Sequence, residues 1–188
     1  GSTRPEIAAA TVVAHGADVG ICLDGDADRV VIIDENGQVA DGDQIMALLA
    51  ARWADESRLN HGTLVATVMS NLGLERFLHG RGLRLERTPV GDRYVVEAMK
   101  EHGWDLGGEG SGHVLCSDLN STGDGIVSAL QVLRALSDSG VTLHELKSGM
   151  SKFPQIMINV RLPRKVDISD NAEVNLVVED AEKQLDGR

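Results

Sequence analysis

The stretch Val19-Gly20-Ile21-Cys22-Leu23-Asp24-Gly25-Asp26-Ala27-Asp28-Arg29-Val30-Val31-Ile32-Ile33 places three aspartates at alternating positions between two apolar runs. Both runs are rich in valine and isoleucine, which is typical of β-strands. Two carboxylates about 4 Å apart repel by roughly 4 kcal/mol at an effective dielectric near 20. Asp24, Asp26 and Asp28 must therefore spread into solvent, take up protons or bind a cation. Oxygen ligands favour a hard ion such as Mg²⁺ or Ca²⁺.

Other interpretations of this loop are weaker. A polar turn between two strands needs only one aspartate, although Asp-Gly is common in turns. A calcium loop of EF-hand type needs glycine at its sixth position and helices on both sides, but Arg29 stands at that position between two strand-like runs. A phosphatase of the haloacid dehalogenase kind would carry a later Gly-Asp-x-x-x-Asp motif. Val96 and Ser128 stand where its last aspartate should be.

Further motifs follow the acidic loop in a fixed order. They are Val90-Gly91-Asp92-Arg93-Tyr94-Val95, Gly108-Glu109-Gly110-Ser111-Gly112-His113, Ser121-Thr122-Gly123-Asp124-Gly125-Ile126 and Phe153-Pro154-Gln155. With the Asp-Gly-Asp-x-Asp-Arg loop at 24–29, this set resembles the α-D-phosphohexomutase superfamily, and within it the bacterial phosphoglucosamine mutases. The resemblance extends over nearly the whole chain. It implies that Asp24, Asp26 and Asp28 bind one Mg²⁺ and that Arg29 is a catalytic residue beside it.

Composition excludes several other classes of function. The 188 residues are 42% hydrophobic and 25% charged, which is the ordinary range for a globular protein. A net charge of −11 argues against a nucleic-acid partner, because binding to a phosphate backbone needs basic patches. No apolar run approaches 18 residues, so no membrane association is expected. Cys22 and Cys116 lack metal-ligand spacing and are predicted to be buried thiols in the cytoplasm.

Strand-like and helix-like segments alternate along the chain, which predicts an α/β fold with a mixed-sheet layer sandwich. We expect residues 1–40 to be the C-terminal part of a metal-loop domain, the second domain of the resembled enzymes. Residues 41–154 are expected to form a complete sugar-recognition domain, the third. Residues 155–188 are expected to be a hinge and the truncated start of a phosphate-binding fourth domain, with a strand at 155–162 and a helix at 168–185.

The glycine-rich loop, residues 107–113, is the second candidate site. Its four glycines let the backbone approach a ligand, and Glu109, Ser111 and His113 offer the mixed polar groups that sugars need. A hairpin with incidental polar residues is the plainer alternative. The resemblance implies that Glu109 and Ser111 contact sugar hydroxyls, with His113 beside them and Arg93 as a further substrate ligand.

The resemblance also implies a mechanism and its cofactors. Such mutases carry a phosphoserine that phosphorylates the sugar phosphate, so that glucosamine 6-phosphate and glucosamine 1-phosphate interconvert through a bisphosphate. Glucosamine 1,6-bisphosphate or glucose 1,6-bisphosphate is the expected activating intermediate. The sequence contains no Thr-x-Ser-His-Asn-Pro and no Ser-Gly-Thr-Glu-Pro motif. The chain is therefore expected to be inactive without the first and fourth domains, and a homodimer of the intact enzyme is a further expectation. The alternatives are phosphomannomutase or phosphoglucomutase activity, or a stand-alone module that binds Mg²⁺ or Ca²⁺.

Overall fold

The computed structural model describes residues 1–161 and 171–185. The chain divides into two compact units, Gly1–Pro154 and Gln155–Arg188. Among the described residues, no helix has both the length and the apolar character needed to cross a bilayer.

The first unit begins with a helix and a small antiparallel sheet. Helix α1 (Pro5–His15) ends at Gly16 in the left-handed conformation, and three strands follow, β1 (Val19–Leu23), β2 (Val30–Asp34) and β3 (Val39–Ala40). Their order in the sheet is β1-β2-β3. Because Leu23 pairs with Val30, the aspartates lie in the loop that closes this hairpin.

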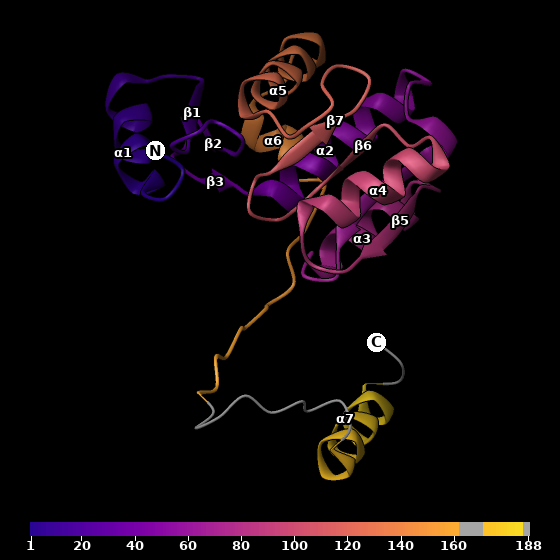
Figure 1. Cartoon of the computed structure of the whole chain (residues 1–188). Helices are drawn as coiled ribbons and strands as arrows, with labels where there is room; N and C mark the ends of the chain where they lie inside the picture. Colours follow the sequence, from indigo (N-terminus) through magenta and orange to yellow (C-terminus); the bar gives the residue numbers. More distant parts are fainter. Residues whose placement is uncertain (162–170, 186–188) are drawn as a thin grey trace. The chain divides into compact units, whose positions relative to one another are not determined.

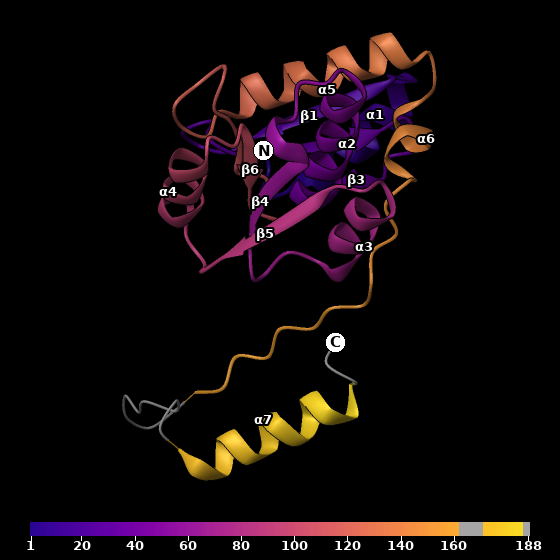
Figure 2. The same cartoon turned by 90° about the vertical axis from the view of Figure 1, so that its right-hand side faces the viewer.

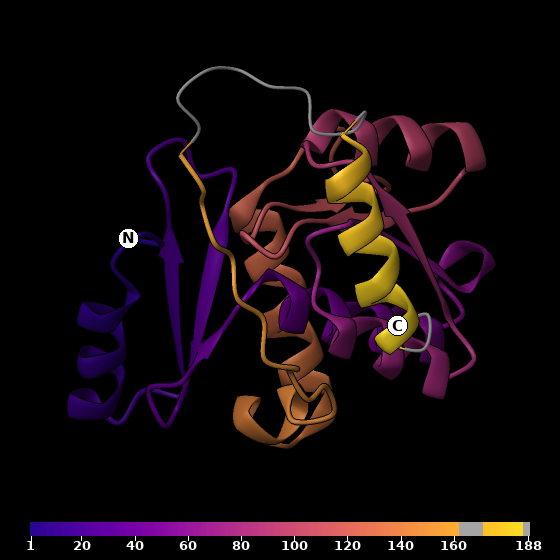
Figure 3. The same ribbon diagram turned by 90° about the horizontal axis from the view of Figure 1, so that it is seen from below.

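The side chains of β2 alternate between two apolar environments. Ile33 packs with Val12 of α1 and with Cys22, so α1 covers one face of the small sheet (Figure 3). Val30 and Ile32 point to the other face and join the main core of the unit. A strand that is buried on both faces explains the nearly continuous apolar run in the sequence.

A second sheet with its helices forms the larger part of the unit (Figure 1). The elements are α2 (Gly42–Asp55), η1 (Asn60–Gly62), β4 (Thr63–Thr67), α3 (Leu72–Gly80), β5 (Arg84–Thr88), α4 (Asp92–His102), β6 (Leu106–Gly108), β7 (Val114–Cys116), α5 (Gly125–Ser139) and α6 (Leu143–Lys147). The strand order is β5-β4-β6-β7. Strand β4 is parallel to β5 and β6, whereas β7 is antiparallel to β6. The glycine-rich loop therefore closes the β6–β7 hairpin.

Helices cover both faces of this sheet. Val65 of β4 packs with Val95 and Met99 of α4. Its neighbours Leu64 and Ala66 face the opposite way, into the core built with α2, α3 and α5. Figure 2 shows α3 and α4 on opposite faces of β4 and β5. The predicted α/β layer sandwich with a mixed sheet is confirmed.

The second unit contains one described helix, α7 (Ala172–Gln184), within the range predicted to be helical. The strand predicted at 155–162 was wrong for the described residues 155–161, which have no regular secondary structure. Alternating apolar residues favour a strand only when another strand supplies the hydrogen bonds. Residue 162 and residues 168–170 of these two predictions lie outside the described part of the chain.

A buried carboxylate joins the small sheet to α6. Asp34, at the end of β2, is fully buried, and its Oδ2 lies 3.0 Å from Nζ of Lys147 and 3.0 Å from Nδ1 of His144. Its Oδ1 accepts hydrogen bonds from the backbone N–H groups of Asn36 and Gln38. Burial alone would raise the pKa of Asp34, but these donors stabilise the carboxylate and hold its pKa below the usual value.

Replacing Asp34 by asparagine tests this cluster. The asparagine amide oxygen can still accept from the two backbone N–H groups, but its NH₂ group then faces the ammonium of Lys147. We therefore expect the free energy of unfolding to fall by roughly 1–3 kcal/mol near neutral pH. Because the pKa of Asp34 is lower in the folded protein than in the unfolded chain, where it is about 3.9, the carboxylate stabilises the fold at pH values above about 3.9. That stabilisation is lost as the pH falls through the pKa of the folded protein. The difference in melting temperature between the two proteins should therefore shrink below about pH 4. A difference that stays constant down to pH 2 would contradict this account.

Candidate metal and sugar site

The Asp loop, residues 24–29, brings its three carboxylates together. One oxygen each from Asp24, Asp26 and Asp28 lies within 4.8 Å of the other two. Ala27 adopts a left-handed conformation with φ of 58°, and this turns the chain between the second and third aspartates. The backbone N–H of Gly125, the first residue of α5, donates to the Ala27 carbonyl at 2.8 Å and ties the loop to that helix.

The electrostatics of the loop are those of an unneutralised anionic cluster. Burial and the neighbouring Asp24 and Asp26 raise the pKa of Asp28. The pKa of Asp24 is lowered, because hydrogen bonding, chiefly from the backbone N–H of Arg29, outweighs its partial desolvation. Asp28 Oδ1 is buried and accepts no hydrogen bond from any described residue. A divalent cation would satisfy that oxygen and remove the repulsion, so the loop fits a hard metal ion.

Backbone hydrogen bonds attach the glycine-rich loop to the Asp-loop hairpin and to the start of α2. The N–H of Val30 donates to the Gly112 carbonyl at 3.0 Å, and the N–H of Gly42 donates to the Gly110 carbonyl at 3.1 Å. Gly112 has φ of +94°, and a Cβ there would lie 2.2 Å from the Val30 carbonyl oxygen. Only glycine fits this close approach of two backbones.

Glu109 and Ser111 lie together at the edge of this loop. The Ser111 hydroxyl donates to Glu109 Oε2 at 3.3 Å, and the backbone N–H of Gly91 donates to Oε1 at 3.3 Å. Both distances are at the long end for hydrogen bonds, so the carboxylate is only weakly engaged. Glu109 is partly exposed and Ser111 is exposed. The two side chains thus have polar atoms free to meet a hydroxylated ligand.

His113 is directed elsewhere. Its side chain is only 6% exposed, and Nδ1 lies 3.1 Å from Asp28 Oδ2. Nε2 is buried without a hydrogen-bond partner among the described residues and lies 4.0 Å from Asp92 Oδ2. The ring thus connects the glycine-rich loop to the Asp loop. This contact could not be predicted from the sequence, because 85 positions separate the two residues.

The two arginines differ in their placement. Arg29 belongs to the Asp loop, with Nε 4.0 Å from Asp24 Oδ2 and a half-exposed side chain. Arg93 is exposed on the first turn of α4, where its guanidinium lies 4.4 Å above the ring of Tyr94 and donates to the Tyr94 hydroxyl. No described hydrogen bond or ion pair joins Arg93 to Glu109, Ser111 or His113.

Sequence reasoning also missed a buried carboxylate beneath the glycine-rich loop. Asp43, in the first turn of α2, is 5% exposed, and its Oδ2 accepts the backbone N–H of Asn71 at 2.8 Å. Burial raises the pKa of Asp43. A Cβ at Gly110 would lie 3.3 Å from Asp43 Oδ2, which limits what can stand at that position. The sequence shows Asp43 only as a residue of a helix start.

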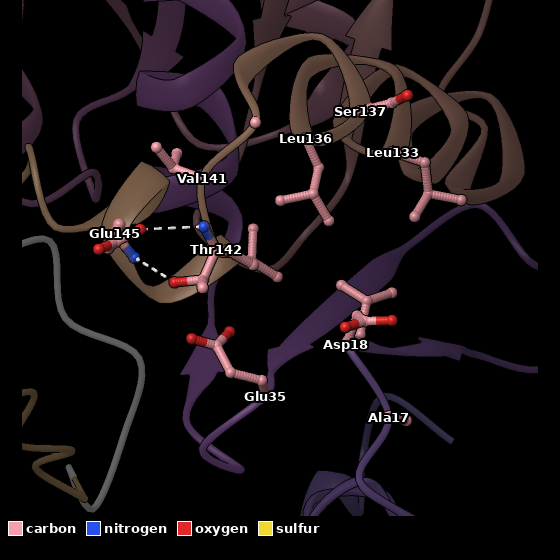
Figure 4. A pocket seen from close by; sticks show the side chains of 12 residues that line it. Ala17, Asp18, Glu35, Leu133, Leu136, Ser137, Val141, Thr142 and Glu145 are labelled. Atoms are coloured by element: carbon pink, nitrogen blue, oxygen red, sulfur yellow. Dashed lines mark hydrogen bonds between the residues drawn. The ribbon is translucent and has the colours of Figure 1, made fainter.

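A cavity of about 730 Å³ lies away from these loops (Figure 4). Leu133 and Leu136 of α5 form part of its apolar wall, and Asp18, Glu35 and Glu145 contribute carboxylates. Glu35 and Glu145 each accept a backbone N–H at the start of α6, so both serve in part to cap that helix. None of the predicted site residues lines this cavity.

The thiols are not part of the site. Cys22 and Cys116 are both buried and unpaired, as predicted. Burial raises the pKa of Cys116 to about 12, so this thiol stays protonated at neutral pH and cannot act as a nucleophile.

Fold and site together define a class of protein, an α/β layer sandwich in which a loop of three convergent carboxylates lies against a glycine-rich loop with exposed polar side chains. Comparison with known proteins agrees with this class. Residues 41–153 match the family model described as phosphoglucomutase/phosphomannomutase, alpha/beta/alpha domain III. The chain belongs to the phosphoglucomutase/phosphomannomutase family, and the resemblance seen in its motifs is confirmed.

Relatives and solved structures show the same similarity. A phosphoglucosamine mutase of Cereibacter sphaeroides is 62% identical over 187 residues, which are 100% of this chain and 42% of that protein. This chain therefore spans less than half the length of that relative. A family protein from Burkholderia thailandensis superposes with a TM-score of 0.72 at 24% identity, over 81% of this chain and 33% of that one.

A third similar protein was solved with ligands. It is N-acetylphosphoglucosamine mutase of Aspergillus fumigatus, in complex with GlcNAc-6P and magnesium. It is 22% identical, with a TM-score of 0.58 over 72% of this chain and 33% of that one. At this level of identity, the likeness establishes the shared fold.

Proposed function

We propose that this chain is the metal-binding and sugar-recognising part of a phosphosugar mutase that interconverts glucosamine 6-phosphate and glucosamine 1-phosphate. The observation that carries the proposal is the junction of the two loops. The Val30–Gly112 hydrogen bond and the His113–Asp28 contact bring the Asp loop against the glycine-rich loop, which supports a cation site beside a site for hydroxyl groups. Identity of 62% to a phosphoglucosamine mutase supports this substrate.

The proposed roles follow from the positions of the side chains. Asp24, Asp26 and Asp28 hold one Mg²⁺, as supported by their convergence and by the magnesium in the Aspergillus relative. When bound, such an ion neutralises charge that develops on a transferring phosphoryl group. Arg29 adds a fixed positive charge next to Asp24, and its half-exposed side chain can reach an anionic group outside the loop. Glu109 and Ser111 bind sugar hydroxyls, and the exposed Arg93 remains a further proposed ligand.

The proposal includes a domain organisation and partners within a longer protein. Residues 1–40 belong to a metal-loop domain, residues 41–154 to the sugar-recognition domain and residues 155–188 to a hinge with the start of a further domain. Domains outside this chain supply the phosphoserine and the phosphate loop, because neither motif occurs in the 188 residues. The bisphosphate intermediate would form only in that assembled enzyme. We therefore expect the chain alone not to interconvert the two glucosamine phosphates.

Titration of the chain with Mn²⁺, an ion that also prefers oxygen ligands, tests the metal site. We expect weak binding, because the phosphoserine oxygen expected as a further ligand lies outside this chain. Asp26→Asn should raise the dissociation constant for Mn²⁺ at least about tenfold. One carboxylate about 4 Å from a divalent ion contributes about 2 kcal/mol of attraction even in water. Electron paramagnetic resonance of free Mn²⁺ measures the dissociation constants of the wild-type chain and of the variant.

The control for this titration is Asp55→Asn. It removes the same charge from the surface at a side chain that is 64% exposed and pairs with Arg81. We expect Mn²⁺ binding to this variant to match that of the wild-type chain. Equal binding by the wild-type and Asp26→Asn proteins would place the cation elsewhere.

A second candidate activity is conversion of hexose phosphates without an amino group. The family model covers phosphoglucomutases and phosphomannomutases, and Gly110 contributes no side chain to the glycine-rich loop. Assays of the longer enzyme with glucosamine, glucose and mannose 6-phosphates distinguish the candidates. The highest kcat/KM identifies the substrate, and a preference for mannose or glucose would replace the glucosamine assignment.

A further inference from the structure

The polypeptide leaves the first unit, which ends at Pro154, through residues 151–153, here called the exit segment. All three residues are exposed and have no regular secondary structure. Met150, just before them, is buried in the main core, whereas Ile156 and Ile158, just after them, are 84% and 79% exposed. The exit segment is therefore the stretch in which the chain passes from the packed unit to an exposed course.

Asn71 holds the last residue of the exit segment by two hydrogen bonds. Its Nδ2 donates to the Phe153 carbonyl at 2.8 Å, and its Oδ1 accepts the Phe153 N–H at 2.9 Å. A side-chain amide offers the same donor and acceptor as a peptide group, so this pairing resembles the paired hydrogen bonds of two antiparallel strands. From this geometry we infer that Asn71 is a positioning residue, which fastens the exit segment so that any movement of the following chain begins after Phe153.

Contacts at the other two positions of the exit segment agree with this role. Lys152 forms an ion pair with Asp41, the N-cap residue of α2. Gly73, in the first turn of α3, lies so close to the segment that an added Cβ would be 2.1 Å from the Ser151 carbonyl oxygen. Each of the three consecutive residues is thus in contact with the start of a helix.

The start of α2 also connects the exit segment to the glycine-rich loop. The backbone N–H of Asn71 donates to Asp43 Oδ2 at 2.8 Å, and a Cβ at Gly110 would lie 3.3 Å from the same oxygen. Gly42 donates its N–H to the Gly110 carbonyl at 3.1 Å. In the proposed domain organisation, Asn71 therefore fixes the point at which a following domain joins the domain that carries the glycine-rich loop. Only this consequence rests on the proposed function.

Asn71 also caps α3, and the cap can be separated from the hold on the exit segment. Its Oδ1 accepts the N–H of Gly73 at 2.9 Å as well as that of Phe153. Serine is as good an N-cap residue as asparagine, but its single hydroxyl is too short to form both bonds to Phe153. Asn71→Ser should therefore keep the cap and release the exit segment, whereas Asn71→Ala should lose both.

The test is amide hydrogen exchange in the 188-residue chain, followed by NMR at the N–H groups of Phe153 and Gly73, with melting temperatures measured alongside. In Asn71→Ser, we expect the Phe153 N–H to exchange at least about tenfold faster, because water becomes its partner, and the Gly73 N–H to stay within about threefold of wild type. In Asn71→Ala, both groups should exchange faster.

The matched control is Asn60→Ser. The Nδ2 of Asn60 donates to the Gly103 carbonyl at 3.2 Å, which is the same type of bond at another place in the unit. We expect the Phe153 N–H of this variant to exchange as in the wild-type chain. Equally fast exchange in Asn60→Ser and Asn71→Ser would show that lost stability is the cause, and would overturn the inference. Unchanged exchange of Phe153 in both Asn71 variants would also overturn it.

Kinetics of the longer mutase test the consequence for the enzyme. Asn71→Ser should lower kcat/KM for glucosamine 6-phosphate about five- to thirtyfold, since the backbone of one released residue must be ordered again whenever the following domain reaches the site. Normal kcat/KM in Asn71→Ser, together with the loss expected for Glu109→Ala, would overturn the positioning role and leave the proposed function intact. A longer mutase that does not convert glucosamine 6-phosphate would overturn the proposed function, while hydrogen exchange still decides whether Asn71 holds the exit segment.

Discussion

Replacing Glu109 by alanine in the longer mutase is expected to lower kcat/KM for glucosamine 6-phosphate about ten- to a hundredfold. A hydrogen bond from a charged group to a ligand contributes roughly 1.5 to 3 kcal/mol, and its loss appears directly in kcat/KM. The carboxylate is available for this role because its two contacts, with Gly91 and Ser111, are both 3.3 Å long. Steady-state kinetics on the purified variant provide the measurement.

Stability should change little in the same variant. Glu109 is partly exposed, and its hydrogen-bond partners can bind water in its absence. We therefore expect the free energy of unfolding to fall by less than about 1 kcal/mol. Glu35→Ala is the matched control, because Glu35 also accepts a backbone N–H at 3.3 Å, from His144, and lies outside the glycine-rich loop. Normal kcat/KM in Glu109→Ala together with a lowered melting temperature would favour the alternative of a plain hairpin.

Gly112→Ala is expected to lower the free energy of unfolding by about 3–5 kcal/mol, which corresponds to a fall of roughly 6–20 °C in melting temperature. Two effects add. A residue with a Cβ is strained at φ of +94°, and the Cβ would overlap the Val30 carbonyl oxygen 2.2 Å away. The overlap must push β2 and the glycine-rich loop apart, and the Val30–Gly112 hydrogen bond is then lost.

Gly82→Ala separates the two effects. Gly82 also has positive φ, +72°, but a Cβ there would meet no heavy atom within 4 Å. We expect the free energy of unfolding of this variant to fall only by the cost of backbone strain, roughly 1 kcal/mol. Similar losses in both variants, measured by thermal unfolding, would show that the approach of Gly112 to Val30 contributes nothing.

Much of the fold could be predicted because local pattern and tertiary environment agree. The apolar run 30–33 is a strand buried on both faces, and Asp41 and Asp124 cap α2 and α5 where a short polar residue precedes each helix. The failure at 155–161 has the opposite cause. The alternation of apolar and polar residues there specifies which side chains would share a face. A strand also needs a neighbouring strand as its hydrogen-bond partner, and residues 155–161 pair with no strand in the described part of the chain.

The candidate site was predictable only in part. Local spacing identified Asp24, Asp26 and Asp28 as a cluster, and the structure brings their oxygens together. The contact between His113 and Asp28 could not be predicted, because a contact between residues 85 positions apart leaves no periodic signal in one sequence. The buried Asp43 was missed for the same reason, since the backbone N–H that its carboxylate accepts belongs to Asn71, 28 positions away.

The main-chain hydrogen bonds that hold the glycine-rich loop have a consequence for substitutions at positions 109 and 111. Val30 meets Gly112, and Gly42 meets Gly110, through main-chain groups alone. Replacement of the side chains at 109 and 111 leaves those main-chain groups in place, so the loop can change the polar groups that it exposes and still keep its attachment to β2 and α2.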